Sequence, residues 1–240
     1  MEDLMNWASP VPLFGVEDPD RLERMRSFLE NYAEAHRLKQ TSVSLRFAWK
    51  CHEGQFRKSR NRLPYISHPL LMAMHAITLG LVDDDLLAAC LLHDVLEDCP
   101  VSREELPCSE AAKDAIELLT FEIAEGEDRD SAKARYYERL SHNGIAAMVK
   151  MLDRCNNVSY MVDAFSLKKI QQYVVETKIY FYPLPVSIRQ EFPEYADAAF
   201  ALKYHIYSVI STIEIMLDRF NMRERTDVPQ PDPNIPEKYY

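Results

Sequence analysis

Glycine is scarce in this sequence. Only five glycines occur among 240 residues, and no two of them are close together. Phosphate loops and dinucleotide fingerprints need closely spaced glycines, because the backbone itself must approach the phosphate. Both kinds of site are therefore excluded. Any phosphate bound by this chain must be held by side chains or by a metal ion.

Cysteine patterns and long apolar runs are also missing. The five cysteines form no Cys-x-x-Cys pair, and their number is odd. They are interpreted as reduced thiols of a cytoplasmic protein. The longest apolar stretch near the end, Ile206 to Leu217, is too short and too polar to span a bilayer. The acidic start, Met1-Glu2-Asp3, is followed by no apolar run, so we expect no signal peptide.

Positive charge is in the minority. Lys and Arg number 28 against 38 Asp and Glu, and the formal net charge is −10. This balance argues against a broad nucleic-acid surface. A small anionic substrate is still compatible, because one local loop is basic: Arg57, Lys58, Arg60 and Arg62 fall close together without an acid between them. A solvated surface loop is the alternative, but its position just before His68 favours a role at a site.

Strand signals are poor, whereas helical periodicity recurs along the chain. Asp18-Pro19 is a good helix start. Further helices are expected over about 42–52, 68–79, 83–97, 109–120, 131–141, 145–163, 167–181 and 191–221. The helix over 83–97 is apolar nearly all round, which predicts a central position. The acidic stretch 122–130 is expected to be a mobile surface loop. These patterns predict one all-α domain over 18–221, with an N-terminal extension (1–17) and a polar, Pro-rich tail (222–240).

The most informative residues are His68 and the adjacent pair His93-Asp94. Imidazoles and carboxylates suit one divalent metal, which polarises phosphoryl oxygens and makes hydroxide available near neutral pH. Residues four apart stack on a helix, so Glu97 and Asp98 would stand one turn away, where they could position or deprotonate water. A purely structural network would need a cation for each carboxylate. The pattern therefore favours a metal site for phosphate-ester hydrolysis.

Such a site needs a second carboxylate from later in the chain. Asp153 is the best candidate, because it shares a polar stripe with Lys150 and Asn157 on a helix whose other face is apolar. Taken alone, Asp153 would more often be a solvated or salt-bridged carboxylate.

Five segments then occur in an order that identifies a family. They resemble the hydrolase domain of RelA/SpoT homologues, a branch of the HD-domain phosphohydrolases, and they are residues 52–59 (HEGQFRKS), 64–69 (PYISHP), 91–98 (LLHDVLED), 149–157 (VKMLDRCNN) and 176–184 (ETKIYFYPL). The resemblance covers roughly residues 20 to 200 and implies an all-α HD-type helical bundle. No synthetase or regulatory segment follows in the sequence. We therefore expect a stand-alone small alarmone hydrolase, similar in layout to the metazoan SpoT homologue.

The resemblance also implies roles for individual residues. One Mn²⁺ would be bound by His68, His93, Asp94 and Asp153. Glu97 and Asp98 would be the catalytic acidic pair that activates water. The nucleotide would be lined by Arg57, Ser59 and Asn157, with further positive charge from Lys58, Lys150 and Arg154. The implied reaction removes the 3′-pyrophosphate from the guanosine alarmones ppGpp or pppGpp, giving GDP or GTP.

Three departures from the family pattern touch the expected nucleotide pocket. The basic loop is two residues longer than usual. After Asn157 the chain has Val158-Ser159-Tyr160, where many relatives carry an Arg two residues after the Asn, and Cys155-Asn156 replaces the usual Leu-His. None of them touches the metal set. The sequence therefore leaves open hydrolysis of another phosphorylated nucleotide, such as an adenine alarmone or the 2′-phosphate of NADPH, and a non-catalytic alarmone-binding module. It also leaves open the oligomeric state and whether 122–130 forms a lid.

Overall fold

The computed structural model describes residues 19–58 and 63–224. Within these ranges the chain is helical, and the sole β-type pairing is an isolated antiparallel bridge between Phe56 and Pro64. The helices are α1 (Pro19–Ala35), α2 (Lys39–Cys51), α3 (Ser67–Thr78), α4 (Asp84–Leu92), α5 (Val95–Asp98), α6 (Glu110–Leu119), α7 (Arg129–Ser141), α8 (Gly144–Ala164), α9 (Leu167–Glu176), α10 (Leu184–Glu191) and α11 (Ala196–Glu224). None of these described helices is both long and apolar enough to cross a membrane.

Helix α4 lies at the centre, as its composition predicts. All residues from Leu86 to Leu92 are fully buried, and α4 packs against α2, α3, α6 and α8. Its start is well defined, because the Asp83 carboxylate accepts a hydrogen bond from the Leu86 N–H at 2.8 Å. The next residue, Asp84, accepts bonds from the backbone N–H groups of Gln40 and Thr41 at 3.0 and 2.8 Å. One end of the core helix thereby fixes the first turn of α2.

The predicted continuous helix over 83–97 is wrong at a critical place. Helix α4 ends at Leu92 and the short α5 begins at Val95. Asp94 between them has φ −100° and ψ −1°, outside the range of a regular helix. Its carboxylate accepts a hydrogen bond from the Tyr65 hydroxyl, which ties this turn to the start of α3. His93 and Glu97 therefore do not share one regular helix as expected, although both side chains line the same small cavity.

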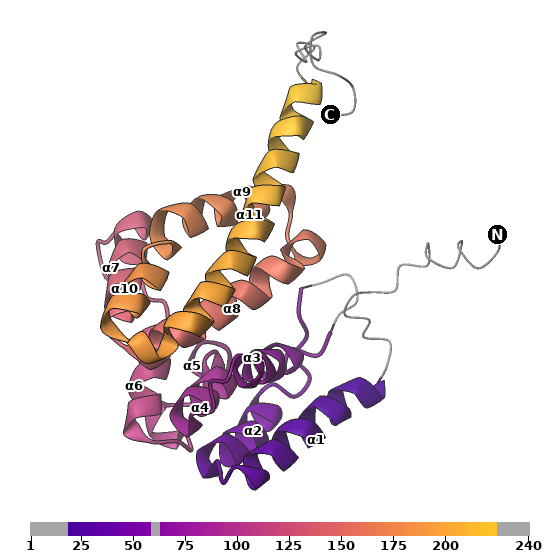
Figure 1. The fold of residues 1–240 in the computed structure, drawn as a ribbon, viewed down its shortest axis with the longest axis vertical. Coiled ribbons are helices and arrows are strands. Elements are labelled where there is room, and N and C mark those ends of the chain that lie inside the picture. The colour runs from indigo at the N-terminus through magenta and orange to yellow at the C-terminus, as the bar shows by residue number, and fades with distance from the viewer. Residues whose placement is uncertain (1–18, 59–62, 225–240) are drawn as a thin grey trace, which may run out of the picture.

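Helix α8 is the second spine of the fold. It packs against α3, α4 and α6 on one side and against α7, α10 and α11 on the other. Figure 1 shows α1 to α4 gathered below it, with α7, α9 and α10 above it and the long α11 crossing the molecule. At least half of the 21 residues of α8 are buried, among them Asp153 and Arg154. Charged residues on a core helix must be paired, so α8 carries paired polar groups into the interior of the fold.

The C-terminal third departs from the predicted boundaries. The expected helix over 167–181 ends as α9 at Glu176 and continues as a π-helix, Thr177–Phe181. The expected helix over 191–221 is present as α11, but its predicted start is wrong, because α10 ends at Glu191 and a short 3₁₀ turn (Pro193–Tyr195) precedes α11. Pro193 lacks an N–H and restricts the residue before it, so Phe192 leaves the helical region at φ −132° and ψ 67°. The predicted extension 1–17 and residues 225–240 of the predicted tail lie outside the described residues, whereas 222–224 belong to α11.

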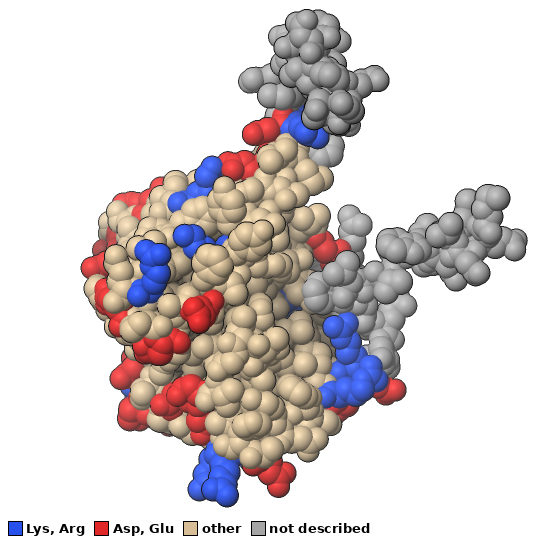
Figure 2. Space-filling model, viewed as in Figure 1, with Lys and Arg blue, Asp and Glu red and all other residues tan. Residues whose placement is uncertain are grey.

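The predicted loop over 122–130 spans most of the surface connection between α6 and α7 and includes the first two residues of α7. Arg135 donates to the Glu127 carboxylate at 2.7 Å and to the Glu122 carbonyl at 3.0 Å. Asp128 caps α7 by accepting from the Asp130 and Ser131 N–H groups, both at 3.0 Å. The segment is exposed, as predicted, but hydrogen bonds hold it against α7. On the face shown in Figure 2, Lys and Arg form small separate groups among acidic residues rather than one broad surface.

Candidate active site

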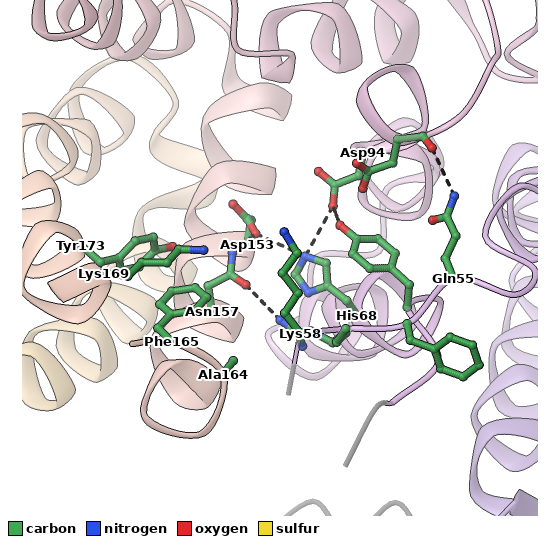
Figure 3. A pocket seen from close by; sticks show the side chains of 14 residues that line it. Gln55, Lys58, His68, Asp94, Asp153, Asn157, Ala164, Phe165, Lys169 and Tyr173 are labelled. Atoms are coloured by element: carbon green, nitrogen blue, oxygen red, sulfur yellow. Dashed lines mark hydrogen bonds and ion pairs between the residues drawn. The ribbon is translucent and has the colours of Figure 1, made fainter. Parts of the chain in front are cut away.

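Four side chains from three parts of the chain meet beside α8. His68 lies in the first turn of α3, and His93 and Asp94 occupy the turn between α4 and α5. His68 Nε2 is 3.8 Å from Asp94 Oδ2 and 3.3 Å from Asp153 Oδ1, and His93 Nε2 is 2.8 Å from Asp94 Oδ2. One ligand atom each of His68, His93 and Asp94 lies within 4.8 Å of the others, the spacing of a metal-binding group. Figure 3 shows Asp153 and Asp94 on either side of His68.

Hydrogen bonds orient both imidazoles toward this point. His68 Nδ1 lies 2.7 Å from Asn156 Oδ1, and His93 Nδ1 lies 3.0 Å from the Cys90 carbonyl oxygen. Because both partners are acceptors, the proton is assigned to Nδ1 and the Nε2 lone pair faces the cluster. His93 Nε2 is buried without a hydrogen-bond partner and lies 2.8 Å from Asp94 Oδ2. A buried imidazole nitrogen aimed at carboxylates, with its other nitrogen anchored, is the arrangement of a metal ligand.

The electrostatics favour positive charge at this point. Burial by itself lowers the pKa of His93, but the Asp94 and Asp153 carboxylates outweigh it and raise that pKa to about 9. Burial raises the pKa of Asp153, yet Lys150 and His68 hold it well below its usual range. The pKa of Asp94 is likewise lowered by His93, against the effect of burial. Both carboxylates are therefore ionised at neutral pH. The residues present fit a divalent cation, with nitrogen and oxygen ligands.

A cavity of about 620 Å³ opens beside the cluster. His68, Asp94 and Asp153 form part of its wall, and Lys58, Lys169 and the rings of Phe165 and Tyr173 form other parts. Figure 3 shows Phe165, Lys169 and Tyr173 facing His68 across this space. Lys169 Nζ lies 3.9 Å from the centre of the Phe165 ring. The cavity thus combines basic groups, aromatic faces and the metal-type cluster.

Arg57 is held in this wall by two neutral amides. Its guanidinium donates to Asn156 Oδ1 and to Asn157 Oδ1, each at 3.0 Å. Its Cζ also lies 4.9 Å from the centre of the Tyr160 ring. Asn157 in turn donates to Asp153 Oδ1 at 2.6 Å. Because these amides do not neutralise it, Arg57 keeps its full positive charge while its position is fixed.

The predicted site residues do not all share one cavity. Arg57, Lys58, Asp98 and Asn157 line the large cavity. Glu97 and Lys150 instead line a smaller cavity of about 160 Å³. Ser59 lies outside the described residues.

The two predicted site residues in the smaller cavity, Glu97 and Lys150, both have defined hydrogen-bond or ion-pair partners. Glu97 Oε1 accepts from the Phe121 N–H at 2.7 Å. Burial raises the pKa of Glu97, and the Phe121 N–H offsets part of that effect. Lys150 is paired with Asp153 Oδ2 at 2.9 Å, so its charge supports that carboxylate.

The position of Arg154 contradicts the prediction that it supplies positive charge around the nucleotide. Its guanidinium is fully buried, donates to Thr177 Oγ1 at 3.1 Å and to Glu176 Oε1 at 2.7 Å, and also reaches the Tyr137 hydroxyl. An enclosed guanidinium cannot touch a substrate, so the predicted role around the nucleotide is wrong. The physical reason is the 100° rotation between neighbours on a helix, which turns Arg154 away from the cavity that Asp153 faces.

Several functional positions escaped sequence reasoning. Tyr65, which bonds Asp94, lies three residues before His68 in the same segment and could have been found by that spacing. Asn156, which joins His68 to Arg57, stands out only as a departure from the family pattern. Phe165, Lys169 and Tyr173 reach the cavity through the turn after α8, and nothing in their local sequence signals this.

Comparisons with known proteins agree with this geometry. Residues 44–161 match the family model described as HD domain. A probable guanosine-3′,5′-bis(diphosphate) 3′-pyrophosphohydrolase of Synechocystis is 32% identical over 145 residues, covering 58% of this chain and 19% of that protein. The Haemophilus influenzae protein of the same activity is 28% identical over 178 residues, covering 68% and 25%. The chain thus spans about a fifth to a quarter of the length of these relatives.

A solved structure supports the fold. The structure reported for a metazoan orthologue of SpoT that hydrolyses ppGpp superimposes with a TM-score of 0.58 at 20% identity, covering 72% of this chain and 95% of that one. At this identity the likeness concerns the fold alone. The expected all-α, HD-type helical bundle is confirmed.

Proposed function

We propose that this chain, which belongs to the HD-domain family through residues 44–161, hydrolyses the 3′-pyrophosphate of ppGpp or pppGpp to give GDP or GTP and pyrophosphate. The relatives named for that activity support the proposal, although they are far longer. The observation that carries it is the cluster of His68, His93 and Asp94, of which His68 and Asp94 lie, together with Asp153, in the wall of a basic and aromatic cavity. A metal-type cluster next to an anion-binding pocket suits phosphate chemistry.

The large cavity suits a nucleotide. Its volume of about 620 Å³ lies within the range of about 300–1,000 Å³ typical of small-molecule sites. Phe165 and Tyr173 offer rings for a base, while Arg57, Lys58 and Lys169 offer positive charge for phosphates. By the family resemblance, Arg57 would lie near the base and Asn157 near the ribose or a phosphate.

We assign one Mn²⁺ to His68, His93, Asp94 and Asp153. When bound, such an ion polarises a phosphoryl oxygen and lowers the pKa of water. The chain's own residues orient the site: the Tyr65 hydroxyl holds Asp94, the Asn157 amide and Lys150 hold Asp153, and Asn156 holds His68. Fixed ligands of this kind lose little freedom when the ion binds.

Glu97 and Asp98 would handle protons on opposite sides of the cluster. Glu97 Oε1 is occupied by the Phe121 N–H, so Oε2 is the atom that would take a proton from water. The raised pKa of Glu97 makes this carboxylate a better proton acceptor than an ordinary surface glutamate. Asp98 faces the nucleotide cavity and would position the attacked phosphate or the water beside it.

The substitution Glu97→Gln tests these roles. It should leave the bound metal in place and lower kcat by about a hundredfold or more, because amide nitrogen and oxygen cannot accept the proton. Metal content after dialysis and initial rates of ppGpp hydrolysis measure the two effects. The exposed Glu34 on α1 provides a matched control, since Glu34→Gln should change neither. Full activity of Glu97→Gln would show that the assigned role is wrong.

A second candidate is hydrolysis of a different phosphorylated nucleotide. It is favoured by the hydrogen bond from Arg57 to Asn156, because Asn156 is a position where the family pattern differs. A panel of ppGpp, pppGpp, an adenine alarmone and NADPH, assayed with Mn²⁺ and with chelator, decides between them. We expect the guanosine alarmones to be turned over and chelator to stop the reaction. Tight binding with no product from any nucleotide would instead identify a binding module.

A further inference from the structure

The metal-type cluster separates two cavities. His68 lines only the cavity of about 620 Å³, His93 lines only the one of about 160 Å³, and Asp94 lines both. The adjacent acids divide in the same way, with Asp98 toward the large cavity and Glu97 toward the small one. A reaction centred on this cluster can therefore be reached from two sides. The small cavity is used by none of the nucleotide contacts proposed above.

Size limits what the small cavity can hold. A cavity of about 150 Å³ in another protein admits a benzene molecule, and the present one is of that order at about 160 Å³. A nucleoside is too large for such a space. A single phosphate or a diphosphate is small enough, particularly because the cavity continues outward. Arg129, Lys133 and Glu176 line both this cavity and a wider groove of about 730 Å³.

Charge favours an anion at the outer end of the small cavity. Lys133 Nζ lies 2.8 Å from Glu176 Oε2, and the other Glu176 oxygen binds Arg154 at 2.7 Å. Arg129 lies in the same wall, with its guanidinium over the Phe121 ring at 5.9 Å. Arg129, Lys133 and the enclosed Arg154 outnumber Glu176 by two, and Asp130 in the adjoining groove reduces this excess to one positive charge. Lys150 adds none, because Asp153 neutralises it at 2.9 Å.

The inner end of the same cavity carries the opposite charge. Glu97 lies there beside Asp94, and both line the wall next to His93. The Glu97 carboxylate at the inner end and the excess positive charge at the outer end produce a field that draws an anion outward along the cavity. This is the arrangement expected of an exit rather than of an entrance for a negatively charged substrate.

We propose that the small cavity is an exit subsite for the inorganic diphosphate product, held by Arg129 and Lys133 and released through the adjoining groove. The inference rests on the proposed function. In that reaction a water oxygen bonds to the phosphorus attached to the 3′-oxygen, and the bond to the 3′-oxygen breaks with its electron pair. The 3′-oxygen takes a proton, so the nucleoside diphosphate and diphosphate separate. The nucleotide leaves by the large cavity and the diphosphate by the small one.

Binding of the two products to the full-length, metal-loaded protein tests this division. Isothermal titration with inorganic diphosphate and, separately, with GDP at matched free metal should give two independent sites. Arg129→Gln and Lys133→Gln should each weaken diphosphate binding by about tenfold or more, as expected for a lost charge-assisted hydrogen bond. Both should leave GDP affinity within about twofold. Lys58→Gln, in the large cavity, should show the reverse pattern.

Controls separate this inference from the proposed function. Lys168→Gln removes an exposed lysine of α9 that lines neither cavity, and it should change neither affinity. Thermal melts show whether Lys133→Gln, which breaks the Glu176 pair, remains folded; Arg129→Gln breaks no buried pair. If GDP fails to bind while diphosphate still depends on Arg129, the nucleotide assignment fails and the subsite stands. Equal losses for GDP and diphosphate, or no loss for diphosphate, would overturn the exit subsite.

Discussion

The two sides of α8 use charge in opposite ways. Asp153 faces His68 and the large cavity, whereas its neighbour Arg154 faces α9 and the π-helix. On the arginine side, Thr177, Glu176 and Tyr137 enclose one cation and satisfy both of its terminal nitrogens. On the aspartate side, the imidazole Nε2 atoms of His68 and His93 face the carboxylates of Asp94 and Asp153, and His93 Nε2 has no hydrogen-bond partner. The comparison teaches that a buried cation whose terminal nitrogens are paired serves stability, even with Arg154 Nε left without a partner, whereas His93 Nε2, unpaired among the carboxylates of a metal-type cluster, is suited to a ligand.

The largest effect is expected on the aspartate side. His93→Ala removes the imidazole whose Nε2 faces Asp94, so bound metal and ppGpp turnover should both fall to background. The helical circular dichroism spectrum should be retained, because the apolar contacts of α4 are unchanged. Metal analysis after dialysis and a nucleotide assay measure the two losses. A variant that still binds one equivalent of metal would remove His93 from the ligand set.

On the arginine side, Glu176→Gln should change stability rather than metal binding. Arg154 and Lys133 outweigh the effect of burial and lower the pKa of Glu176 to about 2. Removing this carboxylate leaves the buried Arg154 uncompensated, which should cost about 3 kcal/mol of unfolding free energy at neutral pH. Urea unfolding measures that loss. Metal content per folded molecule should be unchanged, which is the opposite of the result for His93→Ala.

The pH dependence of the same variant sharpens this prediction. The folded pKa of Glu176 is below its ordinary value, so its contribution is complete above that ordinary value and is lost as the pH falls through about 2. The difference between wild type and Glu176→Gln should therefore shrink from pH 5 toward pH 2. Glu191→Gln, at an exposed contact with His142, serves as the control and should have little effect. A pH-independent difference would show that the carboxylate charge is not the cause.

A smaller effect is expected from changing Asn156, which links His68 on the aspartate side of α8 to Arg57. Asn156 accepts hydrogen bonds from both His68 Nδ1 and Arg57. Asn156→Ala should weaken metal affinity by about tenfold to a hundredfold, because His68 loses the partner that orients it. The Michaelis constant should also rise, since Arg57 loses one anchor. Ser159→Ala, whose hydroxyl bonds the Cys155 carbonyl and His205 away from the cavity, provides the control. Unchanged metal affinity would mean that the ring is held by packing alone.

Much of this fold was accessible from sequence because it depends on local periodicity. The apolar composition of residues 83–92 predicted the central α4, and the stripe of α8 predicted which face carries Asp153. The positions at which the helices are interrupted could not be predicted from the sequence. The turn at His93-Asp94 depends on Tyr65, 29 residues away, and the separation of α10 from α11 depends on how Phe192 and Pro193 are accommodated. Local preference cannot decide such points, because long-range contacts override it.

The sequence by itself determined the helical fold class and the candidate metal ligands. Its ordered motifs carry His68, His93, Asp94 and Asp153. The types and spacing of these residues indicate divalent-metal binding, since few other functions need imidazoles and carboxylates in that combination. Only the tertiary structure decided where each charge goes. It turned Arg154 into the core, sent Glu97 and Asp98 into different cavities, and brought Phe165 and Lys169 opposite His68. The reason is geometric: the direction of a side chain follows from helix rotation and packing angle, which neighbours distant in sequence impose.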